Sequence, residues 1–196
     1  MDEGSASRTI EVQVDKNAAL YYYPQPVIPF AQSAFDSKMT IHLEDETSKL
    51  FLLEIISCGR NAHEERFQYR RFSSKVLLYR GEKLIYRDNT RYEPGKMPME
   101  GIGLYEGFTH MANLFLSKLC DRGDADGLDR TSELKEKIWQ ILDEDSEVDG
   151  GVTRLTTGNL ALRIFGHRAQ KLQQIAEKIK EIYTSCQINH KSVMNE

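Results

Sequence analysis

The sequence predicts a mainly β fold, a layered or β-helix-like sheet body, with two α-helices in the C-terminal third. Apolar and polar residues alternate over much of the first two thirds, which is the period of a half-buried strand. Two later segments repeat apolar residues every three or four positions, as amphipathic helices do. The 196 residues suffice for one domain with a sizeable core. We therefore expect a single domain over 1–196, with a disordered tail over 187–196.

The first strand is predicted in RTIEVQVD, residues 8–15, where Ile10, Val12 and Val14 alternate with polar residues. A second, tyrosine-rich strand follows in AALYYY and is stopped by the first proline of the chain.

The next segment, PQPVIPF, holds three prolines, which cannot donate hydrogen bonds to a sheet. We therefore expect an extended connector or edge rather than a central strand. Its Val27, Ile28 and Phe30 are expected to dock inward.

Further strands are predicted in the middle of the chain. KMTIHLEDE alternates apolar and polar residues, LFLLEIIS is apolar on both faces apart from Glu54, and RFQYRRF alternates aromatic residues with polar ones. KVLLY and KLIYRD flank the loop RGE and predict a hairpin. The apolar segment GLYEGFTHMANLFLSKL fits either a strand or a helix.

The last third changes character. CDRGDADGLDR is predicted as an acidic loop, TSELKEKIWQILDED as a helix, and GVTRLTTGNLALRIFG as a hairpin that turns at TTGN. HRAQKLQQIAEKIKEIY is predicted as a second helix, with Leu172, Ile175, Ile179 and Ile182 forming its apolar stripe.

Composition excludes several classes of function. The net charge of −4 gives no broad electrostatic reason to bind nucleic acid or an anionic membrane, and no apolar run is long enough to span one. Three widely spaced cysteines indicate neither a zinc site nor a disulfide framework and are typical of a reducing, cytoplasmic location. The polar N-terminus does not resemble a signal peptide. No nucleotide-binding or hydrolase motif is present, so the residues alone show no active site.

The stretch EIISCGRNAHEERF raises the question of a Cys58–His63 nucleophile pair or a metal site. No cysteine-protease signature surrounds Cys58, and the HEE triplet lacks the second histidine of a zinc motif. A cysteine at the end of a strand followed by an exposed loop histidine is the favoured interpretation.

Glu54 stands out because a carboxylate inside an apolar strand is costly to bury without a partner. Arg60 or Arg66 could supply the positive charge. Two interpretations stay open, a structural ion pair within the β scaffold and the lining of a polar channel. Asp88 in IYRDN has the same two interpretations.

The order of several segments resembles the UreD family of urease accessory proteins, also named UreH. The matching pieces are a proline-rich segment at 24–30, the segment 54–67, the segment 88–94, a TH pair at His110, and the glycine-rich segment 151–166. The match covers essentially the whole chain. The family's GE dipeptide is replaced here by Glu64 and Glu65.

The resemblance implies a role without catalysis. UreD-like proteins bridge the urease apoprotein to UreF and to the GTPase UreG, and this assembly loads nickel. It also implies a nickel path through the UreD-like protein, along which nickel is transported rather than retained. Oxygen ligands and water hold Ni²⁺ loosely, as a conduit requires. The implied candidates for transient contact with nickel are Glu54, Glu65, Asp88, Cys58 and His63. The stretch EIISCGRNAHEERF is expected to be a strand that runs into a turn, with Glu54, Arg60 and Glu65 forming one polar constellation.

Structural or partner contacts are expected of Arg60, Pro26, Pro29 and His110. Family chains carry further sheet before RTIEVQVD, so this chain is expected to begin inside the family pattern. If nothing precedes it, the strands that the further sheet should pair would expose an edge. Two alternatives remain: a carbohydrate-active β-helical enzyme that uses carboxylates such as Glu54 and Asp88, which needs them about 5–9 Å apart in an open cleft, and a non-functional truncated fragment.

Overall fold

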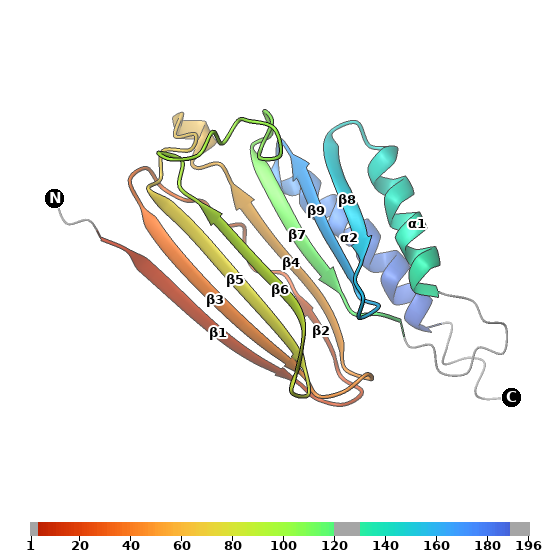
Figure 1. Ribbon diagram of the computed structural model, residues 1–196. Helices are drawn as coiled ribbons and strands as arrows, with labels where there is room; N and C mark the ends of the chain where they lie inside the picture. The colour runs from red at the N-terminus through yellow and green to blue at the C-terminus, as the bar shows by residue number, and fades with distance from the viewer. Residues whose placement is uncertain (1–3, 120–129, 189–196) are drawn as a thin grey trace, which may run out of the picture.

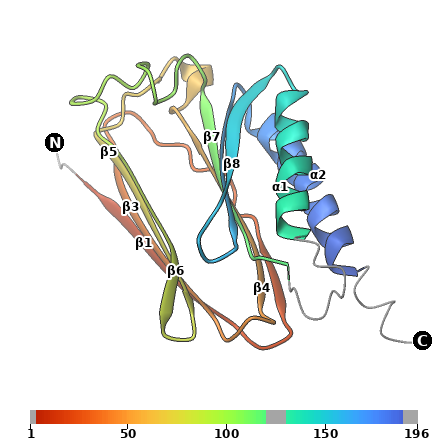
Figure 2. The same cartoon turned by 45° about the vertical axis from the view of Figure 1, so that its right-hand side comes forward.

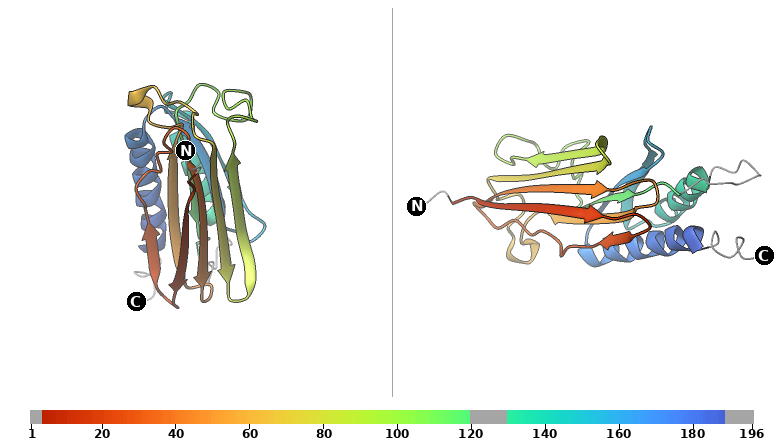
Figure 3. Two further views of the ribbon diagram at one scale, coloured as in Figure 1. Left: turned by 90° about the vertical axis from the view of Figure 1, so that its left-hand side faces the viewer. Right: turned by 90° about the horizontal axis from the view of Figure 1, so that it is seen from below.

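The computed structural model describes residues 4–119 and 130–188, which form two β-sheets and two α-helices (Figure 1). The sheets face each other, and both helices lie on the side of one sheet that points away from the other (Figures 2 and 3). The predicted mainly β, layered architecture with two late helices is confirmed. Among the described residues, no helix is both long and apolar enough to cross a membrane.

The first sheet contains four strands in the order β1-β3-β5-β6. They are β1 (Ala6–Val14), β3 (Ala34–Leu43), β5 (Arg71–Arg80) and β6 (Lys83–Tyr92). β1, β3 and β5 run parallel, whereas β5 and β6 form the predicted antiparallel hairpin. This hairpin turns at Gly81, whose φ of 55° is a conformation that glycine adopts without strain.

The second sheet contains five strands in the order β2-β4-β7-β9-β8. They are β2 (Ala19–Tyr22), β4 (Lys49–Ser57), β7 (His110–Leu116), β8 (Val148–Arg154) and β9 (Leu160–Gly166). Successive strands from β1 to β5 alternate between the two sheets, with parallel pairing inside each sheet. The chain therefore coils here as a β-helix does, and the later strands add antiparallel pairs.

Strand β4 is buried on both faces, as predicted. Phe51, Leu53 and Ile55 belong to the core beneath the helices α1 (Arg130–Asp143) and α2 (Ala169–Ile188). Leu50 and Leu52 point the other way, into the core between the two sheets. The predicted stripe of α2 is also confirmed, since Leu172, Ile175 and Ile179 are buried in the same core as Phe51 and Ile182 packs against it.

The proline-rich connector is extended, but only alternate residues point inward. Val27 pairs with Ile56 of β4, and Pro29 is buried. Ile28 and Phe30 are 50% and 56% exposed. The prediction that Ile28 and Phe30 dock inward is therefore wrong, because neighbouring residues of an extended chain face opposite sides.

The structure also corrects or resolves the prediction for three other segments. Residues 66–70 form no strand: Phe67 has a φ of 53°, and β5 begins only at Arg71. The ambiguous segment 103–119 consists of turns followed by strand β7 from His110. Helix α2 continues to Ile188, into the predicted tail. Residues 120–129 of the predicted acidic loop and the tail from 189 lie outside the described residues.

Candidate functional site

A row of polar side chains crosses the inner face of the first sheet. The strand register aligns Arg8, Ser37, Ser74 and Thr90 across β1, β3, β5 and β6. The serines and Thr90 are buried. Arg8 donates hydrogen bonds from Nη2 and Nε to Ser37 Oγ, at 3.1 and 3.3 Å. On β3 and β5, small hydroxyl side chains thus lie where the neighbouring inward positions carry large apolar groups.

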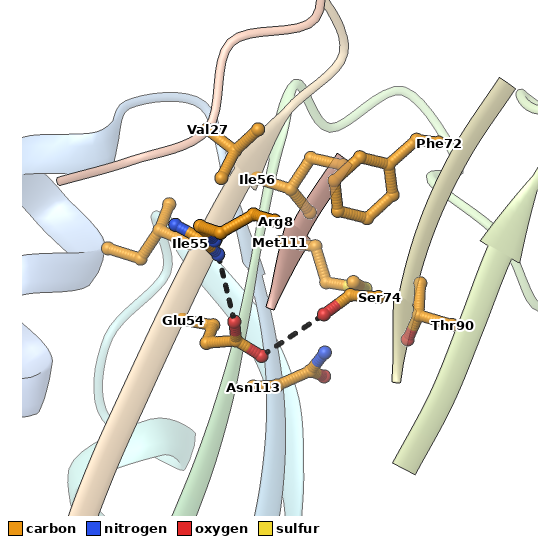
Figure 4. A pocket seen from close by; sticks show the side chains of 10 residues that line it. All are labelled: Arg8, Val27, Glu54, Ile55, Ile56, Phe72, Ser74, Thr90, Met111 and Asn113. Atoms are coloured by element: carbon orange, nitrogen blue, oxygen red, sulfur yellow. Dashed lines mark hydrogen bonds and ion pairs between the residues drawn. The ribbon is translucent and has the colours of Figure 1, made fainter. Parts of the chain in front are cut away.

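A second polar row crosses the facing sheet. Glu54, Asn113 and Arg163 are aligned by the register of β4, β7 and β9. Figure 4 shows Glu54 and Asn113 between the sheets, with Arg8 and Ser74 directed at the Glu54 carboxylate. We call the two rows together with Asp88 of β6 the polar belt; its members are Arg8, Ser37, Glu54, Ser74, Asp88, Thr90, Asn113 and Arg163.

The polar belt divides the apolar core between the sheets into two parts. One cluster contains Met39, Ile41, Leu52, Val76 and Leu78. The other contains Ile56, Phe72, Tyr92, Tyr105 and Met111. An apolar residue at each belt position would merge the two clusters and bury more apolar area, so the belt costs hydrophobic stabilisation. The belt is therefore the feature of this core that packing alone does not explain, and we take it as the candidate site.

Glu54 is the most enclosed acid of the belt, with 15% of its side chain exposed. Its Oε1 lies 3.8 Å from Arg8 Nη2, and Ser74 Oγ donates to its Oε2 at 3.4 Å. Burial raises the pKa of Glu54; the Arg8 charge opposes this shift and the Asp88 charge adds to it. Both contacts of Glu54 are longer than a typical hydrogen bond, so they hold its carboxylate weakly.

Asp88 lies on the opposite sheet and is held more firmly. Thr90 Oγ1 donates to its Oδ2 at 2.9 Å, and Arg163 Nη2 donates to its Oδ1 at 3.1 Å across the gap between the sheets. Arg163 also donates from Nε to Asn113 Oδ1 at 2.9 Å. The Arg163 side chain is 48% exposed, so this end of the belt reaches solvent.

Two small cavities lie along the belt. One of about 20 Å³ is lined by Arg8, Glu54, Ser74, Thr90 and Asn113 together with apolar neighbours (Figure 4). The other, of about 10 Å³, lies among Glu54, Asp88, Asn113 and apolar side chains. A polar cavity of roughly 10–15 Å³ can hold one water molecule. Glu54 and Asn113 line both cavities, so each of these side chains lies beside two spaces about the size of a water molecule.

The belt atoms that could ligate a metal are carboxylate, hydroxyl and amide oxygens. Hard or borderline divalent cations accept ligands of these types. Within the described ranges, no group of three or more His, Cys, Asp or Glu side chains could hold a metal ion. The belt residues that the structure describes therefore form no closed metal cage, and their oxygen atoms lie beside the guanidiniums of Arg8 and Arg163.

Comparison with known proteins identifies the family. The family model described as UreD urease accessory protein matches residues 1–195. The chain belongs to the UreD family. This confirms the resemblance seen in the sequence.

Several curated relatives carry the same UreD or UreH name. Urease accessory protein UreH of Helicobacter pylori strain J99 is 32% identical over 183 residues, and UreD of Acetivibrio thermocellus is 32% identical over 184. UreD of Haemophilus influenzae strain PittGG is 29% identical over 194 residues. These alignments cover 93%, 93% and 94% of this chain. The chain spans 64%, 66% and 68% of the length of those relatives.

The UreD-like segment 54–67 is a strand that runs into a turn, as predicted, but it forms no single polar constellation. Glu54 lies in β4, whereas Arg60 and Glu65 pair with each other in the turn beyond it. Arg60 Nε donates to Glu65 Oε2 at 2.8 Å, and the backbone N–H of Ala31 donates to the same oxygen at 3.1 Å. These hydrogen bonds, that from Arg60 foremost, lower the pKa of Glu65. The Arg60–Glu65 pair thus fastens the proline-rich connector to this turn.

The predicted partner of Glu54 is wrong. Arg8, and neither Arg60 nor Arg66, supplies the positive charge. Arg66 instead pairs with Glu100 and donates to the carbonyl oxygen of Gly107 at 2.9 Å. Arg8 lies in β1 of the facing sheet. Its proximity to Glu54 is therefore not evident from the positions of the two residues in the sequence.

Cys58 and His63 fit the favoured interpretation. Cys58 follows β4 and is fully buried, and burial raises the pKa of its thiol. His63 is exposed at the end of the 3₁₀ turn Asn61–His63. No hydrogen bond joins them in the described part of the chain. A buried neutral thiol and an exposed imidazole do not make a nucleophile pair.

The remaining UreD-like positions are structural in their surroundings. Pro29 is buried beside Gly59, while Pro26 is half-buried in the connector. His110 opens β7, and its Nδ1 lies 2.8 Å from Thr109 Oγ1, which donates to the carbonyl oxygen of His167 at 2.8 Å. Because that hydroxyl proton is committed to His167, His110 Nδ1 carries the proton of this hydrogen bond. Burial lowers the pKa of His110.

Proposed function

We propose that this protein is a urease maturation factor that works in a complex with UreF-like and UreG-like accessory proteins, UreG being the GTPase. In this proposal it provides a path by which Ni²⁺ reaches the urease apoprotein and is not itself an enzyme. Membership of the urease accessory family supports the role in urease maturation. The polar belt supports the path.

One observation carries the path: each facing sheet contributes one belt carboxylate, Glu54 and Asp88, and cavities of water size lie beside them. Two carboxylates attract a divalent cation, while the cavities let it keep part of its hydration shell. Such a site binds weakly enough to release its ion, which a conduit needs. Glu65, Cys58 and His63 lie outside the belt and stay sequence-based candidates for transient contact with nickel.

Both belt carboxylates are paired with arginine in this structure, Glu54 with Arg8 and Asp88 with Arg163. A guanidinium repels an entering cation, so in this proposal the two ion pairs are a closed state of the path. Opening requires the guanidiniums to move. The long 3.8 Å contact of Arg8 with Glu54 and the half-exposed side chain of Arg163 support such a movement.

The carbohydrate-active alternative has little support from the site. Glu54 is enclosed and paired with Arg8, and its neighbouring cavities hold about 20 and 10 Å³. A glycoside hydrolase needs its two carboxyl groups to face an open, substrate-sized cleft.

The test is urease maturation in cells that carry urease, the UreF-like and UreG-like proteins and the full chain. We expect Glu54→Gln combined with Asp88→Asn to lower the nickel content of urease at least tenfold while the variant still co-purifies with its partners. The matched control neutralises two exposed carboxylates outside the belt, Glu82→Gln with Glu177→Gln, and should leave nickel content unchanged. Full nickel loading by the belt variant would refute the path. Failure of the unaltered chain to co-purify with the UreF-like protein or urease would refute the maturation role.

A further inference from the structure

We propose that the outer face of the first sheet binds an acidic segment of a partner protein. The helices lie against the second sheet only, so this outer face has no helical cover (Figures 2 and 3). The strand register places five basic side chains on it, Lys38, Arg71, Lys75, Arg87 and Arg91. Two carboxylates, Glu11 and Asp36, share the face. This is a local positive charge on a chain whose net charge is −4. The binding site is independent of the proposed nickel path on the inner face.

The central row of this face places two lysines side by side. Lys38 of β3 is the register partner of Lys75 of β5, and their outer neighbours in the row are Thr9 and Asn89. Neighbouring strands lie about 4.8 Å apart, and like charges directly opposite each other destabilise a sheet. Neither lysine forms an ion pair with any described residue. A row that opposes folding in this way is explained if a negatively charged partner neutralises it.

The outer face of the first sheet continues into a groove at the end of the sheet. A groove of about 700 Å³ lies where β5 begins and β6 ends, and Arg71 and Arg91 belong to both the face and the groove. Arg70 and Lys96 add positive charge to its lining, and Glu93 is its one carboxylate among the described residues. Three rows with basic side chains follow one another along the strands: first the row of Arg91, then that of Lys38 and Lys75, then that of Arg87. Successive rows are two residues apart, which is about 6.6 Å. A peptide chain with acidic residues at alternate positions repeats at the same spacing.

An acidic polypeptide fits this surface better than nucleic acid does. Proteins that bind nucleic acid use some 6–10 phosphate contacts over an extended basic surface. Here Arg71 pairs with Asp36, and Glu93 pairs with both Arg91 and Lys96. Few unpaired cations remain, and the rest of the molecule is net negative, so a short segment of carboxylates is the better match.

The test uses the full chain and a fluorescent peptide in which glutamate alternates with serine, with binding measured at low and moderate salt. We expect Lys75→Glu to weaken binding at least tenfold. The same substitution should raise the melting temperature, because it places a carboxylate opposite Lys38. A variant that had merely misfolded would bind the peptide less well, but its melting temperature would not rise. The matched control is Lys178→Glu on α2, which should leave peptide binding unchanged.

Three results with peptides would overturn the proposal: equal binding by wild type and Lys75→Glu, equal loss in Lys178→Glu, or equal binding of a peptide with glutamine in place of glutamate. Tighter binding of single-stranded DNA than of the acidic peptide would also overturn it, in favour of a nucleic-acid surface. None of these outcomes depends on urease maturation, so the proposed function is tested independently of this binding site.

Discussion

Arg163 of β9 donates a hydrogen bond to Asp88 of β6 across the gap between the two sheets, at 3.1 Å. This contact closes the solvent-exposed end of the polar belt, and a second hydrogen bond to Asn113 holds the guanidinium in place. In the proposed nickel path, the residue that neutralises Asp88 is thus also placed to block a cation from entering.

Arg163→Gln is expected to tighten Ni²⁺ binding by the isolated protein. Removal of a partly exposed guanidinium beside Asp88 removes a repulsion of about 1 kcal/mol, which is roughly a fivefold change in the dissociation constant. Isothermal titration with Ni²⁺ measures it. Arg168→Gln, an exposed arginine outside the belt, should leave the affinity unchanged, and weaker binding by Arg163→Gln would contradict a gating role.

Glu54 should make stability depend on pH in a particular direction. Burial raises its pKa above the ordinary value of 4.5. Between the ordinary and the raised pKa, the unfolded chain has lost a proton that the folded protein keeps, so the free energy of unfolding falls as pH rises through this window. We expect Glu54→Gln to gain stability relative to wild type over the same window, measured by urea denaturation at a series of pH values. A difference between the two proteins that is constant with pH would show that Glu54 is not the group responsible.

Much of the fold could be predicted from the sequence because its signals are local. The alternation in RTIEVQVD, the apolar run of β4 and the stripe of α2 each report which side of one element is buried. The start of β5 was missed because Phe67 takes a positive φ, which aromatic content does not indicate. Whether residues 103–119 form a strand or a helix depends on pairing with β4 and β9, which is not a local property.

The candidate site was found only in part. Glu54 was conspicuous because it interrupts an apolar run, and Asp88 was suspected for a similar reason. Arg8, Ser37 and Ser74 were missed, although each occupies an inward position of an alternating strand. A search for polar residues in phase with the apolar ones would have found them. Their meeting with Glu54 could not have been predicted, because it depends on the register of strands distant in sequence.

Gly59 should be intolerant of any side chain. Its φ is 135°, and a Cβ there would lie 1.9 Å from the carbonyl oxygen of Glu65. We expect Gly59→Ala to lower the free energy of unfolding by about 2 kcal/mol or more, because backbone strain and a clash with main chain add together. Gly151→Ala is the control, since a Cβ at Gly151 meets no atom within 4 Å. Equal denaturation midpoints for the two variants would show that the turn after β4 relaxes freely.

Helix α1 should contribute to stability through the face that it turns to the second sheet. Ile138 is fully buried in the core beneath the helices. We expect Ile138→Ala to cost about 3 kcal/mol, the usual range for such a deletion being 2–5 kcal/mol. Gln140→Ala, two residues away on the exposed side, should change stability by less than about 0.5 kcal/mol. Urea denaturation of both variants distinguishes a packed helix from one that is only loosely attached.

The most direct test of the nickel path is to fill it without changing its charges. Ser74 lines the larger belt cavity, whereas Ser73 faces outward on the same strand. Ser74→Val should occupy the water-sized space beside Glu54, and Ser73→Val should not. With equal amounts of each maturation complex, we predict that Ser74→Val sharply lowers the nickel content of urease and that Ser73→Val does not. Equal nickel loading by the two variants would contradict a path through the polar belt.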